Sequence, residues 1–387
     1  FTGFPWNVLG YAFASPAMIL SASLIGIYAL TIVVVLSATL PMAARRSRAV
    51  PTSFHRWSPV VALLAPLAFT IYTLVETQPV QGAGANGPRV RIVQPSVPQR
   101  EKWNPVHTRR IFDDHLALTV TAANGQSDGA RAVDLVVWPE AAMPFLPLNS
   151  EIALNELGQV LRSAPDGTTL LAGALRAEAG VNGADRRVYN SLLGFQSGAP
   201  ARVAAIYDKI HLVPFGEYLP LQRILEGIGL QQLTRLRGGF TPGPSPRPLL
   251  SVERVGSVLP LVCYEVIFPR QLIQGPMRPR VMINVTNDGW FGNTTGPRQH
   301  LHMAQVRAAE EGIPILRSAN NGISAVIDGQ GQIRARLDLD VRGTIDAVLP
   351  PQLAPPLYAR MGDLFFWLAL FLGSFLLFRN SFADSEK

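Results

Sequence analysis

Three long apolar stretches, two near the start of the chain and one near its end, constrain how its 387 residues can fold. The first, residues 17–40, carries no charged side chain and is long enough to cross about 30 Å of hydrocarbon as a helix. The second is residues 58–75, where Pro59 and Pro66 disfavour a soluble helix but are tolerated in a membrane helix. The third, residues 364–378, is shorter, and a buried core helix is the alternative for it. The pattern predicts three transmembrane helices.

The basic residues predict the orientation of these helices. Four arginines lie between the first two spans, and positive loops stay in the cytoplasm. The chain from about residue 77 to 360 would then lie outside the cytoplasmic membrane, on the periplasmic side, and the tail would return to the cytoplasm. The formal net charge is +7, but the arginines are scattered without interleaved aromatics, which argues against a nucleic-acid partner. A single cysteine excludes an internal disulfide and a zinc site of several thiolates.

The chain divides into three predicted parts. Residues 1–80 form a membrane part, residues 88–353 a soluble block after a glycine-rich linker, and residues 358–387 a C-terminal membrane helix with a cytoplasmic tail. Because the sequence opens on Phe1, we expect an N-terminal part to be missing. The soluble block alternates apolar strand-like runs with helical stretches, which predicts an α/β layered domain. The expected strands are 89–94, 133–140, 168–175, 188–195, 257–265, 281–286 and 323–328, and the expected helices are 105–123, 151–163 and 298–311.

The lone cysteine, Cys263, lies at the end of an apolar run, where it is either a small buried residue or a nucleophile. A cysteine nucleophile needs a base, and histidine is the usual one. The histidines offer no obvious partner; we interpret His300 and His302, which flank a leucine, as solvated or capping residues. The pattern predicts no metal site.

Carboxylates and lysine offer an alternative base and cation. Glu140 ends an apolar strand between two prolines, where burial would raise its pKa toward neutrality. Lys209 follows a short strand and could stabilise a thiolate and an oxyanion. Taken singly, Glu140 is as compatible with a solvated loop position as with catalysis, and a residue such as Lys209 is a surface lysine in most proteins. Together with Cys263 they form a set in which each member ends an apolar strand.

This set resembles the Glu-Lys-Cys triad of the nitrilase superfamily, carried here by "VVWPE", "YDKIHLVPFGE", "LVCYEVIFP" and "NVTNDGWFG". The resemblance implies an αββα sandwich with Glu140, Lys209 and Cys263 as catalytic residues. Apolar spans on both sides of the domain, "FTGFPW", "FGEYLP", "CYE" and "NDGWFGNTTGPRQHLHMAQVRAAE" resemble one branch, the bacterial apolipoprotein N-acyltransferases. Members of that family carry more N-terminal membrane helices than the two here.

The resemblance implies a cofactor-free acyl transfer in the bacterial inner membrane. The acyl donor would be a phospholipid, phosphatidylethanolamine in particular, and the acceptor the N-terminal amine of a diacylglyceryl-cysteine on an apolipoprotein. A thioester on Cys263 would link the two steps, with Glu140 as base and Lys209 on the oxyanion.

Further residues match the family by motif. Glu217, Tyr264 and Glu265 would support the triad, whereas Trp103, Trp290 and Phe291 would contact substrate, with ordinary packing as the alternative for these three. We interpret the nearby residues Asn287, Asp288, Asn320 and Asn321 as turn residues. Residues 219–240 mix leucine and isoleucine with arginine, and we interpret them as an arm that touches the membrane interface.

Two other functions remain open on the sequence. A tethered nitrilase-like amidase would hydrolyse a C–N bond of a small molecule with the same triad. A membrane-anchored scaffold protein with a dead nitrilase fold would be expected to lose one of the triad residues, and all three are present here.

Overall fold

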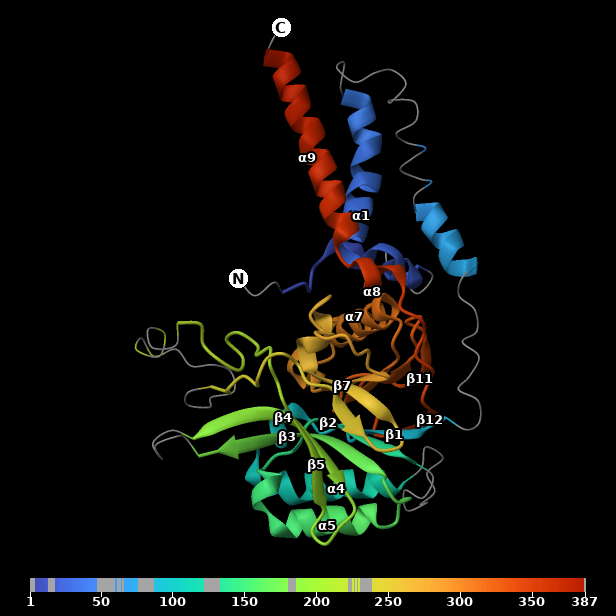
Figure 1. Cartoon of the computed structure of the whole chain (residues 1–387). Helices are drawn as coiled ribbons and strands as arrows, with labels where there is room; N and C mark the ends of the chain where they lie inside the picture. The colour runs from blue at the N-terminus through green and yellow to red at the C-terminus, as the bar shows by residue number, and fades with distance from the viewer. Residues whose placement is uncertain are drawn as a thin grey trace.

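The soluble block is built on two six-stranded sheets that pack face to face (Figure 1). The computed structural model describes residues 4–12, 18–46, 60, 64, 66–75, 87–121, 133–179, 186–221, 225, 227, 229 and 239–385, without the side chains of 41–46 and 376–385. The first sheet has the order β12-β1-β2-β3-β4-β5, and the second has the order β11-β10-β9-β8-β7-β6. Strands of the first sheet are β1 (Arg89–Gln94), β2 (Leu135–Met143), β3 (Thr169–Glu178), β4 (Arg187–Gln196), β5 (Arg202–Asp208) and β12 (Gly343–Val348). Strands of the second are β6 (Leu250–Val252), β7 (Gly256–Val262), β8 (Val281–Thr286), β9 (Ile315–Ala319), β10 (Ser324–Ile327) and β11 (Ile333–Leu337).

Helices cover the outer face of each sheet, which gives the αββα sandwich expected from the family resemblance. Helices α4 (Thr108–Val120) and α5 (Glu151–Leu161) bury Phe112 and Leu157 against the first sheet. Helix α7 (Gly296–Glu311) and the 3₁₀ turn η5 (Cys263–Ile267) cover the second. Between the sheets, Val, Ile and Leu side chains from both inner faces form one fully buried core.

The directions of the strands bring the segments that carry the predicted site residues to one edge of the two sheets. Strands β1, β2 and β3 run parallel, as do β7, β8 and β9, and β5 shares the direction of β3 because both pair antiparallel to β4. Parallel strands bring their carboxyl ends to the same edge of a sheet. The segments that follow β5, β7 and β8 therefore gather near the end of β2 and the start of β4.

Most predicted elements are confirmed, and the differences have clear causes. Strands 89–94 and 281–286 have the predicted bounds, but the strand predicted over 257–265 ends at Val262, where the chain turns into η5. Strand β9 was not predicted, because its buried residues include the charged Arg317. Strands β6, β11 and β12 were also not predicted; each contains exposed or partly exposed positions that interrupt the apolar pattern.

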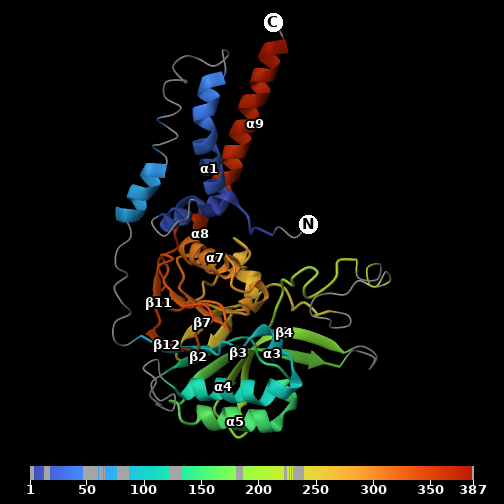
Figure 2. The same ribbon diagram turned by 180° about the vertical axis from the view of Figure 1, so that it is seen from behind.

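The apolar helices lie on the side of the domain that carries α7 (Figures 1 and 2). Among the described residues, Ile19–Leu40 is a helical stretch long and apolar enough to cross a membrane; Pro66–Val75 and Leu364–Phe375 are shorter apolar helices. Helix α1 (Ala22–Arg46) runs beside α9 (Leu364–Ser385), and both contact the domain near α8 (Leu357–Met361). The predicted span 58–75, the linker and the arm 219–240 lie partly outside the described residues.

A buried polar contact joins α1 to the domain. Gly26 has a φ of 73° and breaks the helical geometry of α1. The backbone N–H of the next residue, Ile27, donates to Oε1 of Glu310 on α7 at 2.9 Å. The ring of Tyr358 on α8 fills the space where a side chain on residue 26 would lie. The kink therefore ties α1 to both α7 and α8.

Candidate active site

Glu140 lies on an irregular part of β2 that faces the junction of the two sheets. The pairing of β2 with β3 loses register between Trp138 and Met143, and Ala141 has a φ of 47°. On β3, a Cβ at Gly173 would lie 2.5 Å from the Cα of Glu140, so only glycine leaves room for this bulge. The bulge directs the Glu140 carboxylate into the interior, where it is 7% exposed.

Two donors hold the Glu140 carboxylate in place. Nδ2 of Asn190 on β4 donates to its Oε1 at 2.7 Å, and the backbone N–H of Asn287 after β8 donates to its Oε2 at 2.9 Å. The first donor comes from one sheet and the second from the other. The carboxylate therefore bridges the sheets.

Lys209, the residue after β5, places its ammonium between two carboxylates. Its Nζ lies 3.9 Å from Oε1 of Glu140 and 2.9 Å from Oε2 of Glu217. Glu217 is fixed in turn by the backbone N–H of Val213 at 2.8 Å and by Nδ2 of Asn190 at 2.9 Å. The structure thus brings together three of the residues that the sequence singled out, with Asn190 as a fourth that it did not.

Cys263 is the first residue of η5, directly after β7, and it adopts a φ of 55°. This left-handed conformation is uncommon for residues other than glycine and turns the chain sharply at the sheet edge. Its side chain is partly buried, and both Glu140 and Lys209 act electrostatically on its thiol. The next residue, Tyr264, lies under Lys209, with the ammonium 5.2 Å from the ring centre. The Cys263 thiol is therefore within electrostatic reach of both Glu140 and Lys209.

Burial and charge set the protonation of the site. Burial raises the pKa of the Cys263 thiol, the Glu140 carboxylate raises it further, and Lys209 opposes them. Burial also raises the pKa of Glu140, as the sequence predicted, although Lys209 offsets part of the effect. For Lys209, burial lowers the pKa, but the negative charges of Glu217, Cys263 and Glu140 outweigh it and raise the pKa overall. At neutral pH the thiol of the resting site is therefore held in its protonated form, because its pKa is raised.

Glu265 and Tyr264 hold the Cys263 turn against the Lys209 loop. Glu265 is fully buried; its carboxylate accepts from the backbone N–H groups of Val262 at 2.8 Å and of Ile210 and His211 at 3.0 and 3.1 Å. The hydroxyl of Tyr264 donates to the carbonyl of Leu212 at 2.6 Å. Arg247 pairs with Glu265 at 3.1 Å and, against the effect of burial, holds the pKa of that carboxyl below its usual range.

Behind the cysteine lies a buried ionic cluster that the sequence did not predict. Oδ1 of Asp288 lies 2.9 Å from Nδ1 of His300, and Oδ2 lies 2.7 Å from the Arg317 guanidinium. Nδ2 of Asn284 donates to the carbonyl of Cys263 at 3.0 Å, and the Arg317 guanidinium donates to the same Asn284 side chain. The interpretation of His300 as solvated was wrong: it is fully buried, since the helix turns it inward toward Asp288.

The interpretation of Asp288 and Asn287 as simple turn residues was incomplete for a related reason. Both are buried and form hydrogen bonds across segments far apart in the sequence. Arg317 and His300 outweigh the effect of burial and lower the pKa of Asp288 to about 2. The local spacing of polar residues gave no sign of this cluster, because its members come from η6 (Asp288–Phe291), α7 and β9.

Comparison with known proteins places the chain in a family. Residues 89–356 match the carbon-nitrogen hydrolase family. Over 94% of its length the chain is 40% identical to the apolipoprotein N-acyltransferases of Bradyrhizobium diazoefficiens and Rhodopseudomonas palustris. The chain belongs to the apolipoprotein N-acyltransferase family. It spans 66% and 67% of the length of these two relatives. Its fold is also similar to an amidase of Nesterenkonia from the nitrilase superfamily, with 20% identity and a TM-score of 0.45 over 72% of this chain and 96% of that one.

In this member of the apolipoprotein N-acyltransferase family, the three aromatic residues predicted to contact substrate lie at the surface. Trp103 is 45% exposed, Trp290 is 51% exposed and Phe291 is 36% exposed. The ring of Trp6, from the "FTGFPW" segment, lies 5.4 Å from that of Phe291. The aromatic start of the chain therefore lies beside the segment that follows β8. A role in substrate binding stays a prediction for all three.

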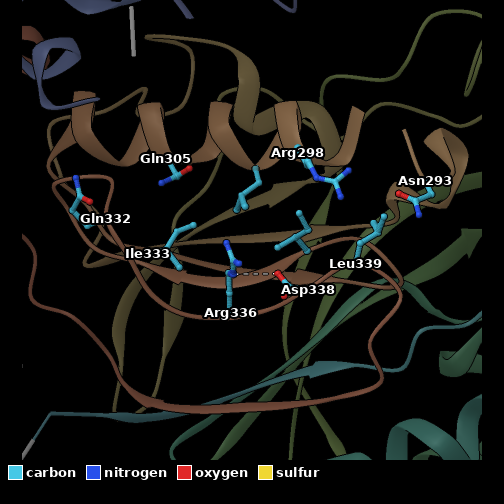
Figure 3. A pocket seen from close by; sticks show the side chains of 10 residues that line it. Asn293, Arg298, Gln305, Gln332, Ile333, Arg336, Asp338 and Leu339 are labelled. Carbon is cyan, nitrogen blue, oxygen red and sulfur yellow. Dashed lines mark ion pairs between the residues drawn. The ribbon is translucent and has the colours of Figure 1, made fainter. Parts of the chain in front are cut away.

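A separate groove of about 730 Å³ lies between α7 and the β10–β11 hairpin (Figure 3). Arg298 and Gln305 reach into it from α7, and Ile333 and Arg336 from the hairpin. Arg336 is paired with Asp338 at 3.1 Å. None of Glu140, Lys209 and Cys263 lines this groove, so it is distinct from the candidate active site.

Among the described residues, no group of three or more His, Cys, Asp and Glu side chains is placed to hold a metal ion.

Proposed function

We propose that this protein transfers a fatty acyl group from a phospholipid to the N-terminal amine of the diacylglyceryl-cysteine of apolipoproteins. The observation that carries the proposal is the cluster of Glu140, Lys209 and Cys263 in a chain whose curated relatives are named for this activity. Glu140, Lys209 and Cys263 act as the catalytic residues. Glu217, Tyr264 and Glu265 support them, and Trp103, Trp290 and Phe291 contact substrate.

In the first step Cys263 attacks the ester carbonyl of the donor. Glu140 takes the thiol proton as the sulfur attacks, which overcomes the raised pKa of the partly buried thiol. Lys209, held by Glu217, stabilises the oxyanion of the tetrahedral intermediate. When the intermediate collapses, the C–O bond breaks, Glu140 returns the proton to the leaving alkoxide, and a lysophospholipid departs. A thioester on Cys263 remains.

In the second step the lipoprotein amine attacks the thioester carbonyl. Glu140 accepts a proton from the amine, the C–N bond forms and the C–S bond breaks, and the sulfur regains a proton from Glu140. A thioester reacts readily with amines but also hydrolyses, so the site must exclude water. Burial of Glu140 and Lys209 is consistent with this requirement.

The membrane setting follows from the substrates. Both the donor and the acceptor are lipid-anchored, and phosphatidylethanolamine is the donor that we propose. The protein would be a multi-pass protein of the bacterial inner membrane, with helices at about 17–40, 58–75 and within 358–387 and a catalytic domain of residues 88–353 in the periplasm. The apolar helix Ile19–Leu40 and the position of α1 and α9 beside the domain support this arrangement.

The direct test is acyl loading of the cysteine. Purified protein in vesicles of phosphatidylethanolamine with a labelled sn-1 chain should acquire label that neutral hydroxylamine removes, and Cys263→Ala should acquire none. A synthetic diacylglyceryl-cysteine peptide should then take up the label. Absence of labelling in the folded protein, together with release of ammonia from small amides, would replace acyl transfer with the amidase function.

A further inference from the structure

A second buried lysine, Lys102, extends toward the candidate active site from a short helix. The proposed function gives this lysine no role. Helix α3 (Gln99–Lys102) follows β1, and the side chain of Lys102 is only 2% exposed. Its Nζ donates to the backbone carbonyl of Glu140 at 2.8 Å. A lysine is rarely this buried without a partner of opposite charge. Among the described residues, no carboxylate forms an ion pair with this ammonium.

Residues at both ends of helix α3 hold Glu140 in place through hydrogen bonds. Lys102, at the last position, binds the carbonyl of Glu140 directly. At the first position, Oε1 of Gln99 accepts from Nδ2 of Asn287 at 2.8 Å, and the backbone N–H of Asn287 donates to the Glu140 carboxylate. The next residue, Trp103, turns outward and is 45% exposed. Within "PQREKWNP", the side chain that contacts Glu140 is therefore that of the lysine.

The geometry points to Lys102 as a positioning residue that also supplies a second positive charge to Glu140 and Cys263. This role rests on the proposed function, but the effect of the charge on Glu140 and on the Cys263 thiol is present in the protein without substrate. The hydrogen bond fixes the bulge of β2 on which Glu140 is carried. The ammonium favours the ionised forms of the base and of the nucleophile, because opposite charges nearby stabilise each other.

The charged surroundings support this role. The titratable groups that act on Lys102 are Glu140 from β2, Cys263 from η5 and His115 from α4. Burial lowers the pKa of Lys102 to about 8, with Glu140 and Cys263 opposing the effect. Burial lowers the pKa of His115 to about 3, so it carries no charge at neutral pH. Lys209 and Glu217 also act on Glu140, and Lys209 and Asp288 also act on Cys263. Lys102 therefore carries a positive charge at pH 7 and loses it above about pH 8.

The test measures the reactivity of the thiol and does not depend on acyl transfer. Cys263 is the only cysteine in the chain, so its alkylation by iodoacetamide reports the thiolate fraction of this one group. The variants are Lys102→Met, which fills the space without charge, and Lys102→Gln, which keeps a donor without charge. Removing a buried charge that lacks an ion-pair partner should not prevent folding, since its desolvation cost is removed as well. Arg100→Gln on the same helix is the control, because the Arg100 side chain is 86% exposed.

At pH 7 both Lys102 variants should alkylate about tenfold more slowly than the parent protein, equivalent to a rise of about one unit in the pKa of the thiol. At pH 9.5 the difference should nearly vanish, because the parent has then lost the Lys102 charge too. Arg100→Gln should match the parent at both pH values. Equal rates at pH 7, or a lag of the same size at both pH values, would overturn the charge role; a lag in Lys102→Met alone would reduce Lys102 to a hydrogen-bond donor. Failure of phospholipid to label Cys263 would instead count against the proposed function and leave this result standing.

Discussion

The two sheets contribute unlike halves to the candidate site. The first sheet and its connections supply Glu140, Lys209 and Glu217, in which one ammonium lies between two buried carboxylates. The second supplies Cys263, backed by Asp288, which is matched by Arg317 and His300. In the first half two carboxylates share the Lys209 ammonium, which lies 3.9 Å from Glu140, whereas in the second half Arg317 pairs with the single carboxylate of Asp288 at 2.7 Å.

Because of this difference, we expect the first half to take part in proton transfer and the second half to stabilise the structure around it. A buried carboxylate whose cationic neighbours do not fully offset its burial has a raised pKa and can exchange a proton during a reaction. A carboxylate paired with the Arg317 guanidinium and hydrogen-bonded to His300 has a lowered pKa and stays ionised. We therefore expect changes in the first half to alter reactivity most, and changes in the second half to alter stability most.

The largest effect should come from Glu140→Gln. This change keeps an acceptor for Asn190 but removes the base, so acyl-enzyme formation should fall by about 10²–10⁴-fold. Alkylation of Cys263 at neutral pH should become faster, because the negative charge of Glu140 raises the pKa of the thiol. Acyl loading and alkylation are measured on the same samples, with the exposed Glu151→Gln as control. A parallel loss of both activities would mean that Glu140 is structural.

The next largest effect should come from removing the Arg317 side chain, which belongs to the second half. Arg317→Met leaves Asp288 buried without its stronger partner, which should lower the free energy of unfolding by about 3–5 kcal/mol. Chemical denaturation in detergent measures the change. Arg254→Met, which removes a partly exposed pair with Asp134, should cost at most about 1 kcal/mol. Similar costs for the two variants would contradict the division between the halves.

The bulge that carries Glu140 should be sensitive to a single methyl group. Gly173→Ala places a Cβ 2.5 Å from the backbone of Glu140, and relieving this overlap should cost about 1–3 kcal/mol of stability and slow acyl loading. Gly275→Ala is the matched control, because a Cβ there meets no atom within 4 Å. If both alanine variants load label at the parental rate, the bulge does not position the base.

An effect of similar size on stability should appear in acid, because Asp288 is protonated there. Its pKa is about 2 in the folded protein against an ordinary value of 3.8, so the ionised form stabilises the fold above about pH 4. That contribution, about 2 kcal/mol, should be lost as the pH falls from 4 to 2. Thermal unfolding of the parent and of Asp288→Asn between pH 5 and 2.5 measures it. The Asn variant should be less stable at pH 5, and the two should converge in acid; parallel curves would show that Asp288 does not titrate in this range.

The sequence by itself determined the layered α/β architecture and the residues at the strand ends. Apolar runs of strand length are a local signal, so β1 and β8 were predicted to the residue. Glu140, Lys209 and Cys263 stood out because each ends such a run, and parallel strands bring their ends together. The family resemblance then joined them into one site.

Only the tertiary structure decided which polar residues are buried together. Asp288, His300 and Arg317 come from three different elements, and their mutual distances depend on how α7 and β9 pack. The same holds for Lys102, whose inward direction relative to Trp103 is set by the contact of α3 with the β2 bulge. Local sequence specifies periodicity and turns, but the burial of a charge depends on partners far along the chain, which only the folded packing brings within reach.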